Sequence, residues 1–336
     1  MPESLLFLTI IIVVALVFDF TNGAHDSANS IATIVSTKVL SPRTAVLMAA
    51  FLNLVGAFIG TEVAHTIGSG IVNAEMVKGC QALTLAALMG AILWNLFTWY
   101  LGLPSSSSHA IIGGLIGSAL AYRGWEALNY ASIFHKILLP LVFSPLAGFM
   151  GGYLLMLGLS WSLCNAHPGR VNTAFRKLQI LSSAFMSTSH GMNDAQKTMG
   201  IITLALFVGH RIPDLTVPAW VKLACALAMA FGTAIGGWKI VKTMGHKIFK
   251  LEAVHGFAAE TAAAVVISGA SLIGAPISTT HTISTSILGV GSSKRLSAVR
   301  WGIAGNMVIA WVLTIPAAAG MAAACFWILE FAGLAG

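Results

Sequence analysis

Long apolar runs separated by short polar stretches cover most of this 336-residue chain. The clearest runs of helix length are Leu5–Phe20, Ala45–Ile59, Leu83–Leu101, Ile137–Leu159, Val221–Gly237 and Phe257–Ile273. An α-helix needs about 20 predominantly apolar residues to cross the hydrocarbon core of a bilayer. The pattern therefore predicts an all-α, polytopic membrane protein with about ten to twelve transmembrane segments, some of them broken or re-entrant helices.

Two related polar segments interrupt this apolar pattern. Residues 20–30 read FTNGAHDSANS and residues 187–198 read STSHGMNDAQKT, so Asp26 and Asp194 each stand among small residues and amides. A charge at the bilayer centre costs roughly 2.5–3.5 kcal/mol on insertion scales, and an intramembrane carboxylate is therefore a candidate functional group. We predict that the first helix breaks at Thr21–Gly23 and that a polar helix follows from Asp26.

Two hydroxyl-rich segments form a second matching pair. Residues 104–109 read PSSSSH and residues 276–281 read PISTTH, with the same spacing from proline to histidine. A polar tip between two apolar stretches indicates a re-entrant hairpin or a broken helix. Such a loop must be buried in protein or line a cavity.

The matching segments indicate an internal duplication. Asp26 and Asp194 are separated by 194 − 26 = 168 residues, and His109 and His281 by 281 − 109 = 172 residues. Broken helices at corresponding positions of two repeats are the best pointer in a sequence to the binding site of a secondary transporter.

The repeats predict how the chain is divided. We expect a first transmembrane repeat over residues 1–160, a basic cytoplasmic linker over residues 161–177 and a second transmembrane repeat over residues 178–336. The loop 239–250 is strongly basic, whereas its counterpart, the polar loop 62–78, is not. This opposite bias predicts that the second repeat is inverted relative to the first.

Composition agrees with a membrane location. The chain is 57% hydrophobic and 9% charged, with a mean hydropathy of +0.86, whereas soluble domains carry about 25% charged residues. The net charge of +7 comes mainly from Lys and Arg in short loops, where they orient a membrane protein rather than bind nucleic acid.

The four cysteines are scattered, so we expect neither a disulfide framework nor a metal site built on them. No basic residue precedes the first apolar run, and Glu3 is the only charged residue there, so we interpret this run as a retained span rather than a cleaved signal peptide.

The residue types indicate what a central site could bind. Broken helices present free N–H groups and a positive dipole end to an anion, and the hydroxyl-rich segments add further donors. Asp26 and Asp194 would repel a bare anion. They fit if cations lie between carboxylate and anion, or if the anion carries protons that it can donate. Both readings favour cation-coupled uptake of a protonatable oxyanion such as phosphate.

The segments GAHDSANS, HGMNDAQKTMG, PSSSSH and PISTTH together resemble the duplicated signatures of the inorganic phosphate transporter (PiT) family. The resemblance covers both halves of the chain. It implies a secondary symporter in the plasma or inner membrane that imports phosphate with Na⁺ or H⁺, by alternating access around a midplane site between two inverted repeats. One departure is His25, because many members have Asn there, as the second copy does at Asn193.

From the residues and the resemblance together we expect the following site. The expected phosphate-binding residues are Ser105, Ser106, Ser107, Ser108, Ser278, Thr279, Thr280, Asp26 and Asp194. The residues expected to couple cations are Asp26, Asn29, Asn193, Asp194 and Glu260, with Na⁺ as a candidate ligand of Asp26, Asn29 and Asp194. The supporting residues are His25, His109, Lys197 and His281. We expect no catalytic residue and no cofactor other than bound Na⁺, and a homodimer is left open.

Other readings remain at this stage. Asp26 and Asp194 could cap helices, Asn29 could form only an interhelical hydrogen bond, and the serines could serve only close packing. The cargo could be sulfate or another tetrahedral oxyanion, and an anion channel is an alternative of another class. An intramembrane hydrolase is disfavoured because neither a GxSxG nor an HExxH motif is present. The sequence does not decide between Na⁺ and H⁺.

Overall fold

The computed structural model describes residues 5–73 and 80–334, which are almost entirely helical. The helices are α1 (Leu5–Ser36), α2 (Pro42–Ala57), α3 (Glu62–Gly70), α4 (Gln81–Leu101), α5 (Ser107–Arg123), α6 (Tyr130–Ser132), α7 (Leu139–Ser162), α8 (Pro168–Val208), α9 (Ala219–Ile235), α10 (Trp238–Lys242), α11 (Ala253–Leu272), α12 (Thr279–Lys294) and α13 (Trp301–Phe331). Short 3₁₀ or π turns occupy Gly124–Ala127, Ile133–Leu138, Thr243–Lys247 and Leu296–Ala298. The predicted all-α class is confirmed.

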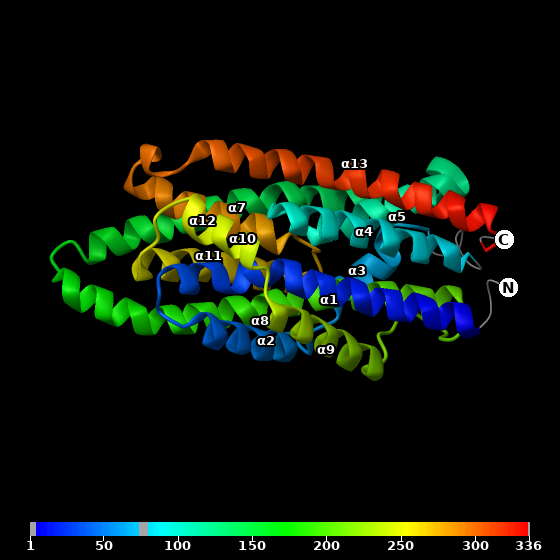
Figure 1. Ribbon diagram of the computed structural model, residues 1–336, viewed down its shortest axis with the longest axis horizontal. Coiled ribbons are helices and arrows are strands. Elements are labelled where there is room, and N and C mark those ends of the chain that lie inside the picture. The colour runs from blue at the N-terminus through cyan, green and yellow to red at the C-terminus, as the bar shows by residue number, and fades with distance from the viewer. Residues whose placement is uncertain (1–4, 74–79, 335–336) are drawn as a thin grey trace.

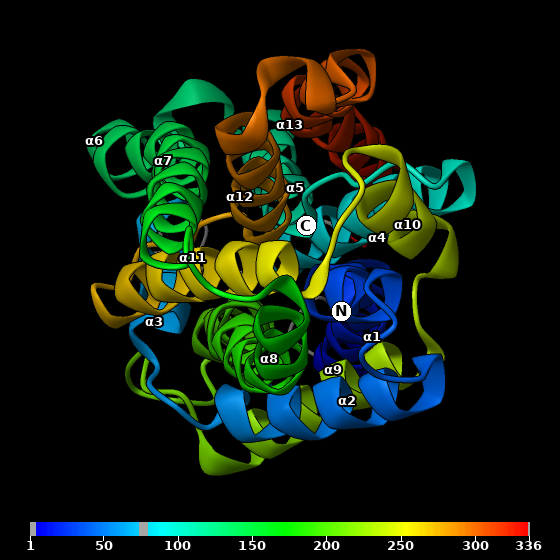
Figure 2. The same cartoon turned by 90° about the vertical axis from the view of Figure 1, so that its left-hand side faces the viewer.

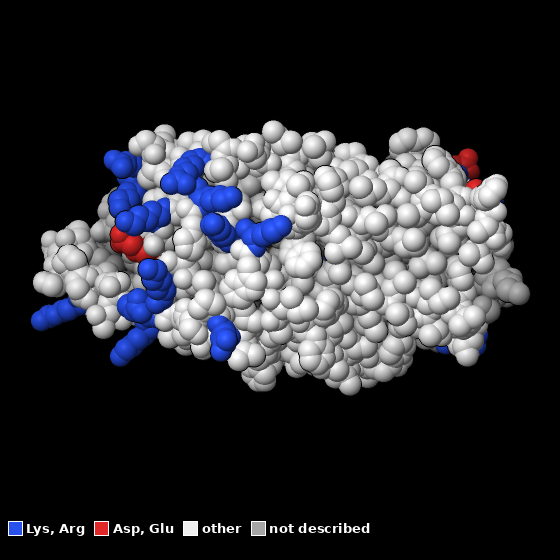
Figure 3. Space-filling view, viewed as in Figure 1, with Lys and Arg blue, Asp and Glu red and all other residues white. Residues whose placement is uncertain are grey.

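The helices form an elongated bundle with both chain ends at the same end of the long axis (Figure 1). Seen end-on, α1 and α8 lie side by side, with α2 and α9 on one side of them and α11, α12 and α7 on the other (Figure 2). On the face shown in Figure 3, Lys and Arg gather over the half opposite the chain ends, and a band without charged side chains separates them from the few charged side chains near the chain ends. This band suits the hydrocarbon core of a membrane.

Five helical segments of the described chain are long and apolar enough to cross a bilayer. Two bent pairs, α2 with α3 at 73° and α9 with α10 at 60°, raise the number to seven. Our expectation of ten to twelve segments included half-spans, and the described residues hold ten helices of 16 residues or more. The difference arises because α8, α5 and α12 are too polar or too short to count as apolar spans.

The predicted break at Thr21–Gly23 is wrong. Helix α1 continues through it to Ser36, because its polar side chains are buried against other helices instead of facing lipid. Helix α8 likewise runs through Asp194 without interruption. The expected linker over 161–177 is mostly helical, since α8 begins at Pro168. In the expected polar loop 62–78, residues 62–70 form α3, and residues 74–79, like Glu3, lie outside the described part.

The predicted hairpin breaks occur at the hydroxyl-rich segments. Gly102, with φ of 67°, ends α4 in the left-handed conformation that glycine adopts without strain. Ser106 then caps α5 by accepting the His109 N–H at 3.2 Å, and Ser278 caps α12 by accepting the His281 N–H at 3.2 Å. The serine-rich tips therefore begin helices as well as interrupting spans.

The two halves pack across each other through glycines. A Cβ added to Gly23 of α1 would lie 2.4 Å from the Met229 carbonyl oxygen of α9, and one added to Gly191 of α8 would lie 2.2 Å from the Asn53 carbonyl oxygen of α2. Each motif-bearing helix thus lies against a helix from the other half of the chain. Such close approach requires small residues at the contact.

A second pair of glycines holds the hairpins in the same crossed way. Gly117 of α5 lies against α13, where an added Cβ would be 2.1 Å from the Ala319 carbonyl oxygen. Gly289 of α12 lies against α7, where an added Cβ would be 2.1 Å from the Phe149 carbonyl oxygen. The two glycines are 289 − 117 = 172 residues apart, which is the offset of the histidines.

We expect Gly289→Ala to destabilise the protein, because the new methyl group meets backbone that cannot rotate away; overpacking costs about 1–3 kcal/mol. Thermal unfolding of the purified protein in detergent measures the loss. Gly158→Ala in α7 is the matched control, since nothing lies within 4 Å of its added Cβ. This change should be neutral or slightly stabilising. Equal melting temperatures for both variants would contradict the packing described.

Candidate functional site

The centre of the bundle holds a pair of buried carboxylates. Asp26 of α1 and Asp194 of α8 lie close together with His190, and a ligand atom of each residue lies within 4.8 Å of those of the other two. All three side chains are buried, with exposed fractions of 2% or less. The fold therefore brings together two aspartates that are half a chain apart in sequence.

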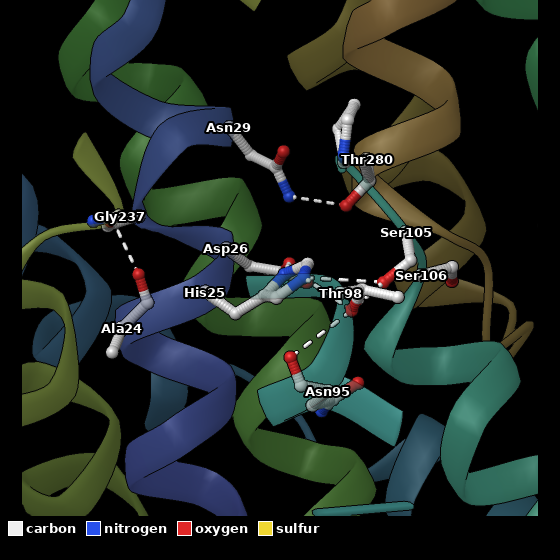
Figure 4. A network of polar contacts seen from close by, with 12 residues as sticks. Ala24, His25, Asp26, Asn29, Asn95, Thr98, Ser105, Ser106, Gly237 and Thr280 are labelled. Atoms are coloured by element: carbon white, nitrogen blue, oxygen red, sulfur yellow. Dashed lines mark hydrogen bonds and ion pairs between the residues drawn. The ribbon is translucent and has the colours of Figure 1, made fainter. Parts of the chain in front are cut away.

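Asp26 is connected to the first hydroxyl-rich segment through His25. The Nδ1 atom of His25 lies 2.6 Å from Asp26 Oδ1, and its Nε2 atom lies 3.2 Å from Thr98 Oγ1 (Figure 4). Ser105 Oγ donates to the same Thr98 oxygen at 2.7 Å. A hydrogen on His25 Nδ1 would be donated to the carboxylate, so this histidine orients Asp26 against the end of α4.

Asp194 is more heavily coordinated than Asp26. Its Oδ1 atom accepts from the Lys197 ammonium group, one helical turn along α8. Its Oδ2 atom accepts from Thr279 Oγ1 at 3.0 Å and lies 3.0 Å from His190 Nε2. Two cationic or potentially cationic groups thus flank this carboxylate, which is the usual requirement for burying a charge.

Lys197 has three hydrogen-bond acceptors and uses all its donors on them. Its ammonium group donates to Asp194 Oδ1, to Ser108 Oγ and, at 3.0 Å, to the Ile277 carbonyl oxygen. A lysine ammonium has three N–H bonds. In this arrangement Lys197 therefore positions both hydroxyl-rich segments and has no donor left for a ligand.

Asn29 occupies the corresponding place in α1, three residues after Asp26. Its Nδ2 atom donates to Thr280 Oγ1 at 2.9 Å (Figure 4) and to Thr279 Oγ1 at 3.2 Å. The connections therefore cross between the halves, because Asn29 reaches the second hydroxyl-rich segment and Lys197 reaches Ser108 in the first.

The hydroxyls of the two segments do different things. Ser106 and Ser278 cap helices, whereas Ser107 Oγ is buried with no hydrogen-bond partner in the described structure. Ser108 Oγ donates to the Ile277 carbonyl oxygen at 3.2 Å, so the two tips touch. The starts of α5 and α12 consequently lie together, and their first N–H groups have no partner within their own helices.

Three of the expected residues lie away from this cluster or play another part. Asn193 Nδ2 donates to Ser271 Oγ at 2.8 Å, on α11, so its amide is used outside the acid pair. The rings of His109 and His281 contact each other edge to face, with centroids 4.4 Å apart, beside the two tips.

Glu260 of α11 forms a separate buried group. Its carboxylate accepts from Thr33 and Ser182, and from Gln179 Nε2 at 3.2 Å. None of these partners belongs to the acid pair or to the hydroxyl-rich segments. Three donors thus satisfy the oxygens of this buried carboxylate.

The sequence interpretation missed some residues that the structure buries within this cluster or near it. Asp19 is buried on α1 and lies within the apolar run Leu5–Phe20, where it was overlooked. The free-energy cost of placing an acid in a membrane span is the signal that could have identified it. His190 lies on the same face of α8 as Asp194, four residues away, which is the spacing of a helical ion pair. Thr98 stands at the end of an apolar helix and carried no comparable signal.

The arrangement is suited to a small anion accompanied by cations. Two helix N-termini and a free serine hydroxyl supply donors and positive potential for an oxyanion. Two carboxylates beside them supply acceptors for a proton carried by that anion, or ligands for a cation. The described side chains of this cluster are buried, so the donors and acceptors act where solvent does not compete.

Comparison with known proteins places this geometry in context. A sequence model of the phosphate transporter family matches residues 22–168 and 164–322. The probable low-affinity inorganic phosphate transporter of Bacillus subtilis (strain 168) is 50% identical over 330 residues, covering 98% of this chain and 99% of that protein. The protein of the same description from Rhizobium meliloti (strain 1021) is 50% identical over 319 residues, covering 94% of this chain and 95% of that protein.

A solved structure has the same fold over nearly the full length. It is described as the sodium-dependent phosphate transporter and superposes with a TM-score of 0.87 at 27% identity, covering 96% of this chain and 99% of that one. With the twofold sequence match, the shared fold and the paired signatures around a buried acid pair, the chain belongs to the phosphate transporter family, and it is a multi-pass protein of the cell membrane.

Proposed function

We propose that this protein imports inorganic phosphate by symport with Na⁺ or H⁺, through alternating access around the site between α1, α8 and the two hydroxyl-rich segments. The observation that carries the proposal is the meeting of two helix N-termini beside the Asp26–Asp194 pair. The names of the relatives and of the solved structure support the cargo.

The acid pair favours phosphate over an anion without protons. Phosphate at neutral pH still carries one or two protons that can be donated to a carboxylate, whereas sulfate carries none. Ser107, with its hydroxyl free of protein partners, and the N–H groups at the starts of α5 and α12 would bind the remaining oxygens. Asp26, Asn29 and Asp194 would hold the coupling cation. Glu260 of α11, which contacts Thr33 of α1 and Ser182 of α8, would be a further acidic group available for coupling.

The crossed hydrogen bonds support alternating access. The halves touch at the site through Asn29 and Lys197, each of which binds the hydroxyl-rich segment of the other half. Rocking of one half against the other would open the site to one side of the membrane at a time, around a fixed midplane position. The inverted relation of the halves belongs to this proposal.

We expect Asp26→Asn to abolish concentrative phosphate uptake while the protein still inserts and folds, because the amide is neutral and similar in volume. Radiolabelled phosphate uptake into proteoliposomes, with Na⁺ and pH gradients imposed separately, measures the effect. Asp214→Asn is the matched control, since Asp214 is exposed and bonds only to Thr216 among the contacts described. Normal uptake by Asp26→Asn would count against the proposed role of the acid pair.

Asp194→Asn should cost stability as well as transport, because it leaves the Lys197 ammonium buried without its counter-ion. Breaking a buried ion pair by removing one partner costs about 3–5 kcal/mol. The double variant Asp194→Asn with Lys197→Met should regain most of the lost melting temperature but no uptake. If Asp194→Asn melts at the wild-type temperature, the ion pair does not hold the site as described.

Substitutions of two neighbouring serines should have different effects, one on phosphate binding and the other on stability. Ser107→Ala should raise the KM for phosphate about tenfold with little change in melting temperature, because a hydrogen bond to a charged ligand is worth about 1.5–3 kcal/mol. Ser106→Ala should instead lower the melting temperature, because losing an N-cap costs about 0.5–2 kcal/mol. Uptake kinetics and thermal unfolding on both variants test this, and the reverse pattern would refute the assignment.

A further inference from the structure

Asp19 and Asn22 form a buried polar group on α1 that the phosphate site does not use. Both side chains are almost fully buried, with exposed fractions of 0% and 1%. Asp19 Oδ1 accepts from Thr198 Oγ1 of α8 at 2.9 Å. The other carboxylate oxygen, Oδ2, and the amide oxygen of Asn22 have no hydrogen-bond donor in the described structure.

The two unpartnered oxygens share one face of the helix. Residues three apart in an α-helix are neighbours, with Cβ atoms roughly 5–6 Å apart. Both atoms are acceptors when Asp19 is ionised, and a buried acceptor without a donor is destabilising. One hydrogen placed on Asp19 Oδ2 and donated to Asn22 Oδ1 would satisfy both at once.

We propose that Asp19 is a proton-binding site of the transport cycle, distinct from the Asp26–Asp194 pair, with Asn22 as the acceptor of the bound proton. The inference rests on the proposed symport and names one of its coupling ions. A proton fits this place better than a metal cation, because the described side chains leave two unpaired oxygens, whereas cations such as Mg²⁺ and Ca²⁺ take about six ligands or more.

The charged surroundings connect this site to the phosphate site. Among the described residues, the ionisable groups that interact electrostatically with Asp19 are Asp194 and Lys197 from α8 and Cys225 from α9. Helix α4 also packs on α1 but carries no Asp, Glu, Lys, Arg or His. A proton on Asp19 removes one negative charge from the neighbourhood of Asp194 and so favours entry of an anion beside it.

Thr198 provides a direct route for this coupling. It follows Lys197 in α8, so the hydroxyl that binds Asp19 and the ammonium group that binds Asp194 and Ser108 belong to adjacent residues. The protonated carboxyl keeps its Thr198 hydrogen bond at Oδ1 and gains a second one at Oδ2. On the other side of the membrane, loss of the proton restores the carboxylate and its repulsion of Asp194.

Asp19→Asn of the full-length protein in proteoliposomes tests the proposal, because the amide mimics a permanently protonated carboxyl. Phosphate–phosphate exchange without gradients should stay within about threefold of wild type, since the phosphate site is intact. Stimulation of uptake by an imposed pH gradient should be lost. Asp214→Asn, the exposed control, should keep both activities, and Asp26→Asn should lose concentrative uptake.

Asn22→Leu gives a second measurement that retains the carboxylate. Without its acceptor the proton is bound less tightly, so the pH of half-maximal uptake should fall by about one unit. Full stimulation of Asp19→Asn by a pH gradient would overturn the proposal, as would a wild-type protein that responds only to Na⁺. A wild-type protein without phosphate exchange would instead overturn the proposed function itself, and this inference with it.

Discussion

The interaction on which the site depends is the buried ion pair between Asp194 and Lys197. A carboxylate at this depth must be neutralised or hydrogen-bonded, because the free-energy cost of its desolvation would otherwise exceed the stabilisation from packing. Lys197 does more than compensate the charge, since it also binds Ser108 and the Ile277 carbonyl oxygen. One ammonium group therefore fixes the relative positions of α8 and both hydroxyl-rich segments.

In the first half of the chain, a neutral residue occupies the position that corresponds to Lys197. Asn29 stands where α8 has Lys197, and Asp26 is bonded to His25 instead of to a lysine. The repeats are thus alike in position and unlike in charge. This asymmetry leaves Asp26 with fewer hydrogen-bond and ion-pair partners than Asp194 among the described residues.

Much of this architecture could be predicted from the sequence. Apolar run lengths gave the helical membrane fold, and the recurring PSSSSH and PISTTH segments marked the hairpin tips and the pairing of Ser106 with Ser278. The continuity of α1 through Thr21–Gly23 could not be read in this way, because helix breaking by polar residues depends on whether neighbours can bury them. Local propensity describes whether an isolated segment forms a helix, whereas tertiary contacts decide whether the helix continues within the bundle.

The same limit explains the residues that sequence reasoning overlooked or placed elsewhere. Asp19 was hidden by the hydrophobicity of its surroundings, and Asn193 carried the motif but bonds to Ser271 on α11. A repeat identifies equivalent positions, whereas the direction of each side chain follows from packing. The serines show this most clearly, because four in a row divide into a Thr98 partner, a helix cap, a free hydroxyl and a Lys197 partner.

The crossed glycine packing has a consequence for biogenesis. Helix α1 is synthesised before α8 and α9, yet it lies against both of these helices, which belong to the second half of the chain. The carboxylate of Asp19 and the amide of Asn29 find their hydrogen-bond partners, Thr198, Thr279 and Thr280, only in that second half. Assembly of the central cluster of buried polar residues must therefore follow synthesis of the second half of the chain.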